Sequence, residues 1–169
     1  MLNNFRGASP SARAEAFNAG SATTVEDPTE KFNLSALCER LMDLLDPTSN
    51  HIISVHGSWI NGDLLTTEQA LRCLLKRTLA RNRDESLSIT IEAVDLSANS
   101  YRIMVADNGR CLPEGQDRFS STREEMDKVK QAVTARGGEF TEKNDAYGKG
   151  VCASFSLAGC VMGFPSQQY

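Results

Sequence analysis

A carboxylate at the end of an apolar strand is the group in this chain best suited to contact a ligand. The run from Tyr101 to Ala106 is rich in apolar residues, and it leads directly into Asp107, Asn108 and Gly109. A carboxylate accepts hydrogen bonds, and a glycine lets the backbone approach a bound molecule closely. The pattern therefore predicts a ligand contact at Asp107. The alternative is a local role, in which the carboxylate accepts hydrogen bonds from amides of its own turn.

A row of basic residues is the second feature with functional content. It lies on one side of a predicted helix whose other side carries leucines. Such a row is either a solvated face or a surface that binds an acidic partner or a phosphate group. Its members are Arg72, Lys76, Arg77, Arg81 and Arg83.

Composition limits the classes of function. A chain of 169 residues suffices for one domain, and 40% hydrophobic and 24% charged residues are ordinary for a globular protein. The net charge of −4 argues against nucleic acid as a partner. With neither an apolar run of about 20 residues nor a secretory signal, we expect a cytoplasmic protein without a membrane contact. The five cysteines lack a Cys-x-x-Cys pair, so we expect free thiols and no metal site.

Three helices are predicted from apolar residues at helical spacing, and they begin near residues 34, 66 and 122. The first ends at Asp46-Pro47, because a residue before proline disfavours helix. The other two open with capping boxes at Thr66 and Thr122. Two glycines at positions 137 and 138 close the last helix.

Five segments are predicted to be strands, and one short segment a turn. Between residues 87 and 94, apolar and polar residues alternate, which indicates a sheet with one covered face. Asn61-Gly62-Asp63 is predicted to be a turn. The predicted strands span residues 51–55, 87–94, 101–106, 139–142 and 151–157.

Helices grouped with mostly adjacent strands predict an α+β fold with two layers. We expect one domain over residues 31–158. A flexible N-terminal tail would precede it at residues 1–30, and a C-terminal tail would follow at residues 159–169.

The strand-end motif and the order of elements resemble the histidine-kinase-type ATPase (Bergerat) family of gyrases, chaperones and histidine kinases. In that family the strand ends in Asp-x-Gly-x-Gly, and the aspartate accepts a hydrogen bond from the adenine amino group. Here Asp107 and Gly109 match, and Cys111 stands in place of the second glycine. The closest resemblance is to catalytic domains of the HWE and HisKA-2 bacterial histidine kinases. It implies a mixed, mostly antiparallel sheet covered by about three helices.

The same resemblance implies that the magnesium–ATP site is degenerate. Arg77 aligns with the asparagine that supplies an oxygen to Mg²⁺, and Cys73 with the glutamate before it. The final Gly-x-Gly-Thr element keeps Gly148 and Gly150, but Val151 replaces the threonine. A residual nucleotide site would therefore consist of Asp107, Gly109, Gly148 and Gly150.

The resemblance and these departures lead to one functional expectation and two alternatives. We expect a non-catalytic, protein-binding regulator in two-component-type signalling, without a catalytic residue, metal or cofactor. Its partner would be a response regulator, a kinase or a sigma-type factor, bound through Arg72, Lys76, Arg77 and Arg81. The first alternative is a domain that binds ATP or ADP without a firm magnesium site and phosphorylates a partner in trans. The second is a homodimer formed through the helix within residues 32–45.

Overall fold

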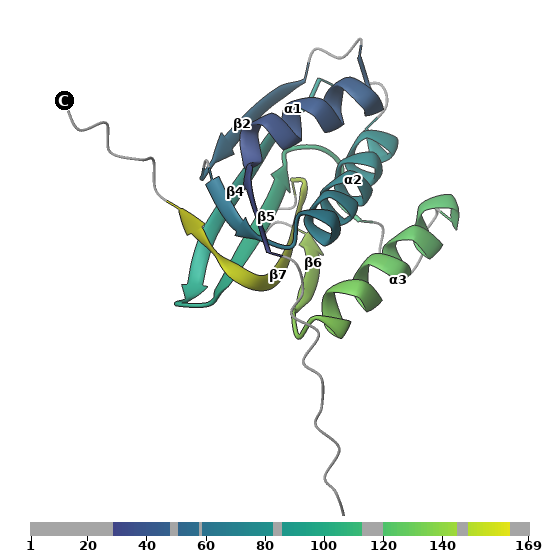
Figure 1. The fold of residues 1–169 in the computed structure, drawn as a ribbon. Coiled ribbons are helices and arrows are strands. Elements are labelled where there is room, and N and C mark those ends of the chain that lie inside the picture. Colours follow the sequence, from purple (N-terminus) through teal and green to yellow (C-terminus); the bar gives the residue numbers. More distant parts are fainter. Residues whose placement is uncertain are drawn as a thin grey trace, which may run out of the picture.

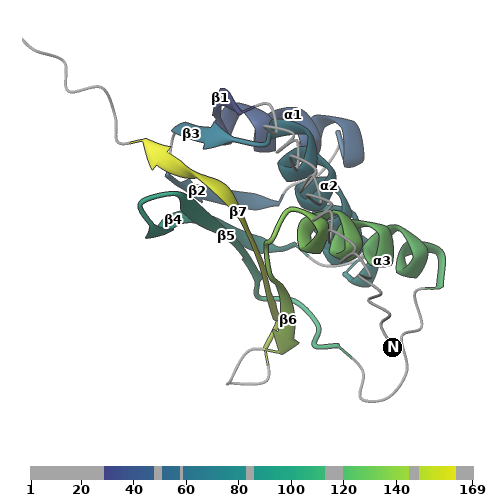
Figure 2. The same ribbon diagram turned by 60° about the horizontal axis from the view of Figure 1, so that its bottom comes forward.

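The computed structural model describes residues 29–47, 51–57, 59–82, 86–112, 120–144 and 149–162, with side chains from residue 123 onward in the fifth range. Three helices cover one face of a single sheet (Figures 1 and 2). The predicted α+β sandwich is therefore confirmed. The helices are α1 (Leu34–Leu45), α2 (Leu64–Arg81) and α3 (Ser120–Ala135). None of the helices in these ranges is long and apolar enough to span a membrane.

Within the described ranges the sheet has seven strands, and of their pairings only β2–β4 is parallel. The strand β7 lies at its centre: β5 pairs along one side, while β6 and β3 pair along the other. The order is β1-β3-β7-β5-β4-β2, with β6 attached to β7. The strands are β1 (Glu30–Asn33), β2 (Ile52–His56), β3 (Trp59–Gly62), β4 (Ser88–Ser97), β5 (Ser100–Asp107), β6 (Phe140–Asn144) and β7 (Val151–Met162).

Alternation along the central strands builds the core, as predicted for residues 87–94. Ile89 and Ile91 of β4, Ile103 of β5 and Phe155 of β7 are fully buried beneath the helices. The apolar stripe of α1 also packs into this core, and Leu41 is fully buried. This stripe packs within one chain, and pairing of two chains through α1 stays a prediction.

Three boundaries differ from the prediction. Asn61-Gly62-Asp63 is not a turn, because Asn61 and Gly62 belong to β3 and pair with β7. The helix α2 begins at Leu64 rather than near Thr66, since Asp63 is its N-cap and accepts the Thr66 backbone N–H at 2.8 Å. The helix α3 begins at Ser120, two residues before the predicted cap.

The predicted tails also lose residues to the sheet. Glu30 is the first residue of β1, and β7 continues to Met162, so residues 159–162 are strand rather than tail. The rest of both predicted tails, residues 1–28 and 163–169, lies outside the described residues.

Candidate functional site

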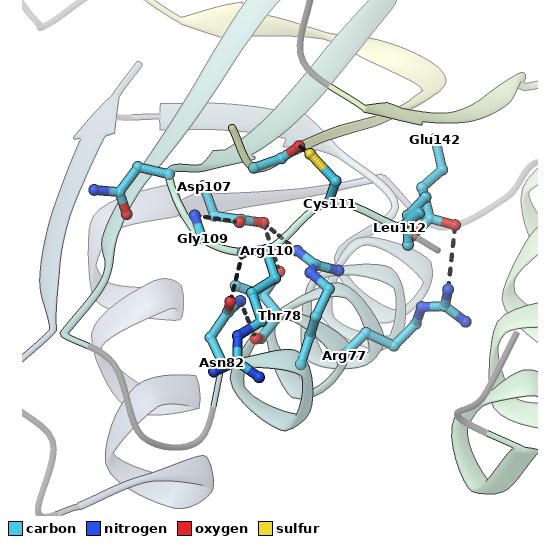
Figure 3. Close-up of polar contacts among 12 residues, drawn as sticks. Arg77, Thr78, Asn82, Asp107, Gly109, Arg110, Cys111, Leu112 and Glu142 are labelled. Atoms are coloured by element: carbon cyan, nitrogen blue, oxygen red, sulfur yellow. Dashed lines mark hydrogen bonds and ion pairs between the residues drawn. The ribbon is translucent and has the colours of Figure 1, made fainter. Parts of the chain in front are cut away.

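Asp107 ends β5, and its carboxylate is enclosed by side chains of α2 (Figure 3). Its Oδ1 atom accepts the backbone N–H of Gly109 at 3.0 Å. Its Oδ2 atom accepts the hydroxyl of Thr78 at 3.3 Å and a hydrogen bond from the guanidinium of Arg81. Only 2% of the Asp107 side chain is exposed. The local role predicted for this carboxylate is confirmed, and a buried ion pair adds to it.

Arg81 provides the positive charge of that pair from the last turn of α2. Its side chain is 4% exposed. Burial lowers the pKa of the guanidinium, while the charges of Asp107 and Glu142 act in the opposite direction. A guanidinium nevertheless stays protonated in proteins, so Arg81 keeps its positive charge. The Nε atom of Arg81 is buried and has no hydrogen-bond partner among the described residues.

A second buried ion pair lies one helical turn earlier on α2. Arg77 contacts Glu142 of β6, with Nη2 and Oε2 3.4 Å apart (Figure 3). The Arg77 side chain is 6% exposed, so this guanidinium is also withdrawn from solvent. The two arginines and the two carboxylates together balance in charge. They connect α2 to the end of β5 and to the middle of β6.

The single exposed basic face predicted for α2 does not form. Arg77 and Arg81 are spaced by one turn on the side of the helix that faces the sheet, where two carboxylates compensate their charges. Arg72 and Lys76 remain exposed. Arg83 lies outside the described residues.

Asn82 is a site residue that the sequence interpretation missed. It caps the C-terminus of α2, and its amide nitrogen donates to the Thr78 carbonyl oxygen at 2.8 Å. Its Oδ1 atom accepts the backbone N–H of Arg110 at 2.7 Å. A Cβ atom at Gly109 would overlap this amide group. The packing against Asn82 is therefore a sufficient reason for glycine at this position. An asparagine directly after a helical pattern was the available signal.

Packing also explains why position 150 is a glycine. It has φ +82°, and a Cβ atom here would overlap the backbone oxygen of Asp107. The thiol of Cys111 lies 3.6 Å from the Gly150 carbonyl oxygen, so the residue in place of the family's second glycine contacts the same turn. Gly148, the other glycine predicted for this element, lies outside the described residues.

The cysteines and His51 give no sign of a metal site in the described part of the chain. All five cysteines are free. His51 accepts the backbone N–H of Leu87 through Nδ1 at 3.1 Å, which ties the start of β2 to β4. Across the described residues, His, Cys, Asp and Glu form no group of three that would hold a metal ion.

Comparison with known proteins relates this arrangement to one fold. No family model and no curated protein matches the sequence. Among solved structures, the mycobacterial sensor histidine kinase MprB matches with a TM-score of 0.64 and 14% identity, covering 80% of this chain and 100% of that one. The nucleotide-free catalytic domain of the histidine kinase ThkA matches with a TM-score of 0.59 and 18% identity, covering 79% and 97%.

A third match is the histidine kinase domain of a blue-light activated histidine kinase from Erythrobacter litoralis. Its TM-score is 0.60 at 20% identity, and the match covers 76% of this chain and 67% of that one. Identities this low establish the fold alone, and the resemblance to the HWE and HisKA-2 group stays a prediction. The chain has the fold of a histidine kinase catalytic domain.

Proposed function

We propose that this chain is a histidine-kinase-like domain without Mg-ATP catalysis, and that it acts as a protein-binding regulator in two-component-type signalling. The observation that carries the proposal is the ion pair between Arg81 and Asp107. This pair joins Asp107 to the guanidinium of Arg81. Asp107 stands at the position that contacts adenine in the resembled family. The chain thus provides its own donor for that carboxylate.

The energetic cost of opening this pair argues against nucleotide binding. Both oxygens of Asp107 already accept hydrogen bonds from protein donors, and the side chain is nearly inaccessible. An adenine amino group would reach the carboxylate only after Arg81 had moved. Separating a buried ion pair costs about 3–5 kcal/mol, because each charge is left uncompensated. A cost of that size lowers affinity by about 100-fold or more.

The residues at the predicted metal position do not fit magnesium. Mg²⁺ requires oxygen ligands in near-octahedral geometry. Arg77 aligns with the asparagine ligand of the family, and a guanidinium has only N–H donors and a positive charge. The carboxylate of Glu142, which contacts Arg77, is engaged by that same guanidinium. We therefore derive no phosphoryl-transfer step for this chain.

The histidines do not suggest an acceptor for phosphoryl transfer within the chain. The sequence contains two, His51 and His56. One is bonded to the backbone of Leu87, and the other ends the edge strand β2. The matched structures are histidine kinases, and by analogy the partner is a signalling protein such as a response regulator, a kinase or a sigma-type factor.

Calorimetric titration with ATP and ADP, each with and without Mg²⁺, tests the loss of the nucleotide site. We expect no heat of binding in any of the four titrations, while an active histidine kinase catalytic domain serves as the positive control. Micromolar, magnesium-dependent binding would overturn the proposal and favour a kinase domain that acts in trans.

A further inference from the structure

A cavity of about 250 Å³ lies between α2 and α3, away from Asp107. The two helices run beside one another on the same face of the sheet (Figures 1 and 2). Cys73 marks its position, since it lies one helical turn before Arg77 on α2. The lining residues are Gln69, Arg72, Cys73, Glu125, Lys128 and Val129.

The floor of this cavity is apolar. Cys73 and Val129 are buried, at 4% and 8% exposure. Burial raises the pKa of the Cys73 thiol to about 11, so this group is neutral near pH 7. The Arg77–Glu142 ion pair, whose charges both act on Cys73, is balanced. An apolar side chain would therefore meet no uncompensated charge at the floor.

The rim of the cavity is cationic. Arg72 and Lys128 are exposed on opposite helices. Lys76 is also exposed, and its charge is matched by Glu125 at 2.8 Å across the two helices. Among the described residues, the two positive charges of Arg72 and Lys128 remain at the rim after this pairing. Complementary charge around an interface directs encounter and selects the partner.

The size of the cavity distinguishes between kinds of ligand. Pockets for drug-sized molecules have volumes of about 300–1,000 Å³, whereas an interface pocket commonly receives one anchoring side chain. We propose that the α2–α3 cavity receives an apolar side chain of an acidic segment in a partner protein, while carboxylates on either side of that residue contact Arg72 and Lys128. This inference rests on the proposed protein-binding function and assigns a place and a chemistry to the contact.

The experiment is an NMR titration of the ¹⁵N-labelled full chain with synthetic peptides. Each peptide is acetyl-Glu-Glu-X-Glu-Glu-amide, with leucine, phenylalanine or tryptophan at X, and glycine at X as the reference. We expect amide shifts concentrated in α2 and α3 around the cavity. We expect affinity at least about threefold higher with the apolar residues than with glycine.

Three variants separate the two parts of the site. Reversing both rim charges, Arg72→Glu with Lys128→Glu, should weaken binding about tenfold or more. Gln69→Trp places a large ring at the cavity without changing charge, and it should remove the preference for an apolar X. Lys143→Glu is the control for each single reversal, Arg72→Glu or Lys128→Glu, because it changes the net charge by the same amount. Lys143 is exposed, and since Glu142 beside it faces α2, Lys143 points to the opposite face of the sheet.

The outcomes also separate this inference from the proposed function. Silence of the cavity amides toward all three apolar peptides at millimolar concentration would overturn the site, while silent nucleotide titrations would still support the regulator. Equal weakening by Lys143→Glu would reveal general charge attraction and overturn it too. The site would also be overturned if inorganic phosphate produced the same shifts and displaced the peptides. Magnesium-dependent ATP binding would instead contradict the proposed function whatever the peptides did.

Discussion

The ion pair of Arg81 and Asp107 permits a quantitative test of the reasoning about the nucleotide site. Arg81→Met removes the guanidinium and leaves the carboxylate buried, with the Thr78 hydroxyl and the Gly109 amide as its remaining donors. Loss of one partner from a buried pair costs about 3–5 kcal/mol. Since small domains are stable by about 5–15 kcal/mol, this variant should remain folded but marginal.

A double-mutant cycle isolates the pair from other effects of each substitution. Asp107→Asn keeps an oxygen that accepts the Gly109 amide but leaves the Arg81 charge uncompensated. We expect this variant also to lose about 3–5 kcal/mol, for the same electrostatic reason. With both substitutions no unpaired charge remains, so the double variant should cost less than the sum by about 2–3 kcal/mol.

Urea unfolding followed by the fluorescence of Trp59, the single tryptophan, provides the free energies. Arg40→Met is the control, because Arg40 forms an ion pair with Glu68 at 2.8 Å while its side chain is 55% exposed. An exposed pair contributes about 0–1 kcal/mol, so this variant should change stability little. Additive effects at positions 81 and 107, or losses as small as the control, would refute the buried pair and leave Asp107 accessible to a ligand.

Three further predictions follow from the packing and the titratable groups. Gly150→Ala should destabilise the fold by several kcal/mol in urea unfolding, because its Cβ would overlap the Asp107 backbone. Gly137→Ala is the control and should cost only about 1–2 kcal/mol, because Gly137 has φ +72° but open space around it. For Asp63, burial alone would raise the pKa, but hydrogen bonds from Thr66 and the Arg136 guanidinium outweigh it and hold the pKa below 3.8. The stability contributed by this carboxylate is therefore present above the pKa of the unfolded state and is lost as the pH falls through the lower pKa of the folded state. Asp63→Asn should therefore reduce the loss of unfolding free energy between pH 6 and pH 2. An unchanged pH dependence in this variant would contradict the prediction. Alkylation by iodoacetamide at pH 8, mapped by mass spectrometry, should be slowest at the buried thiols of Cys38 and Cys73, whose pKa values are raised to about 12 and about 11. Rapid modification of Cys38 would show an open core, and rapid modification of Cys73 would show that the thiol at the cavity floor is ionised.

The sequence predicted the elements that carry their own local pattern. Alternation identified β4, an apolar run that leads into a turn signal identified β5, and helical spacing identified α1 and α2. Each of these patterns is complete within one segment. The strands β1 and β3 were missed because each has four residues. The Asn-Gly pair at residues 61 and 62 is typical of turns, but β7 supplies the pairing that makes it a strand. That pairing joins segments about 100 residues apart, and no local pattern reveals it.

The site was predicted in part for the same physical reason. The carboxylate of Asp107 followed from a strand that ends in a turn signal, which is local information. The burial of Arg77 and Arg81 depends on carboxylates 65 and 26 residues away. An arginine on a helix is usually exposed unless it is paired, so the sequence favoured a solvated row. Only the packing of α2 against the end of β5 and the middle of β6 reverses that expectation.

The retained glycines show why a recognisable motif does not by itself indicate nucleotide binding. Gly109 leaves room for the side-chain amide of Asn82, and Gly150 leaves room for the backbone of Asp107. Both constraints come from the fold and hold whether or not a ligand is present. A chain that loses its metal ligand can replace it with Arg77, because Glu142 compensates the charge, yet it cannot replace Gly150 without breaking the turn. Folding alone would thus preserve Asp-x-Gly and the late glycine, so these residues do not distinguish a nucleotide site from a carboxylate that is paired within the chain.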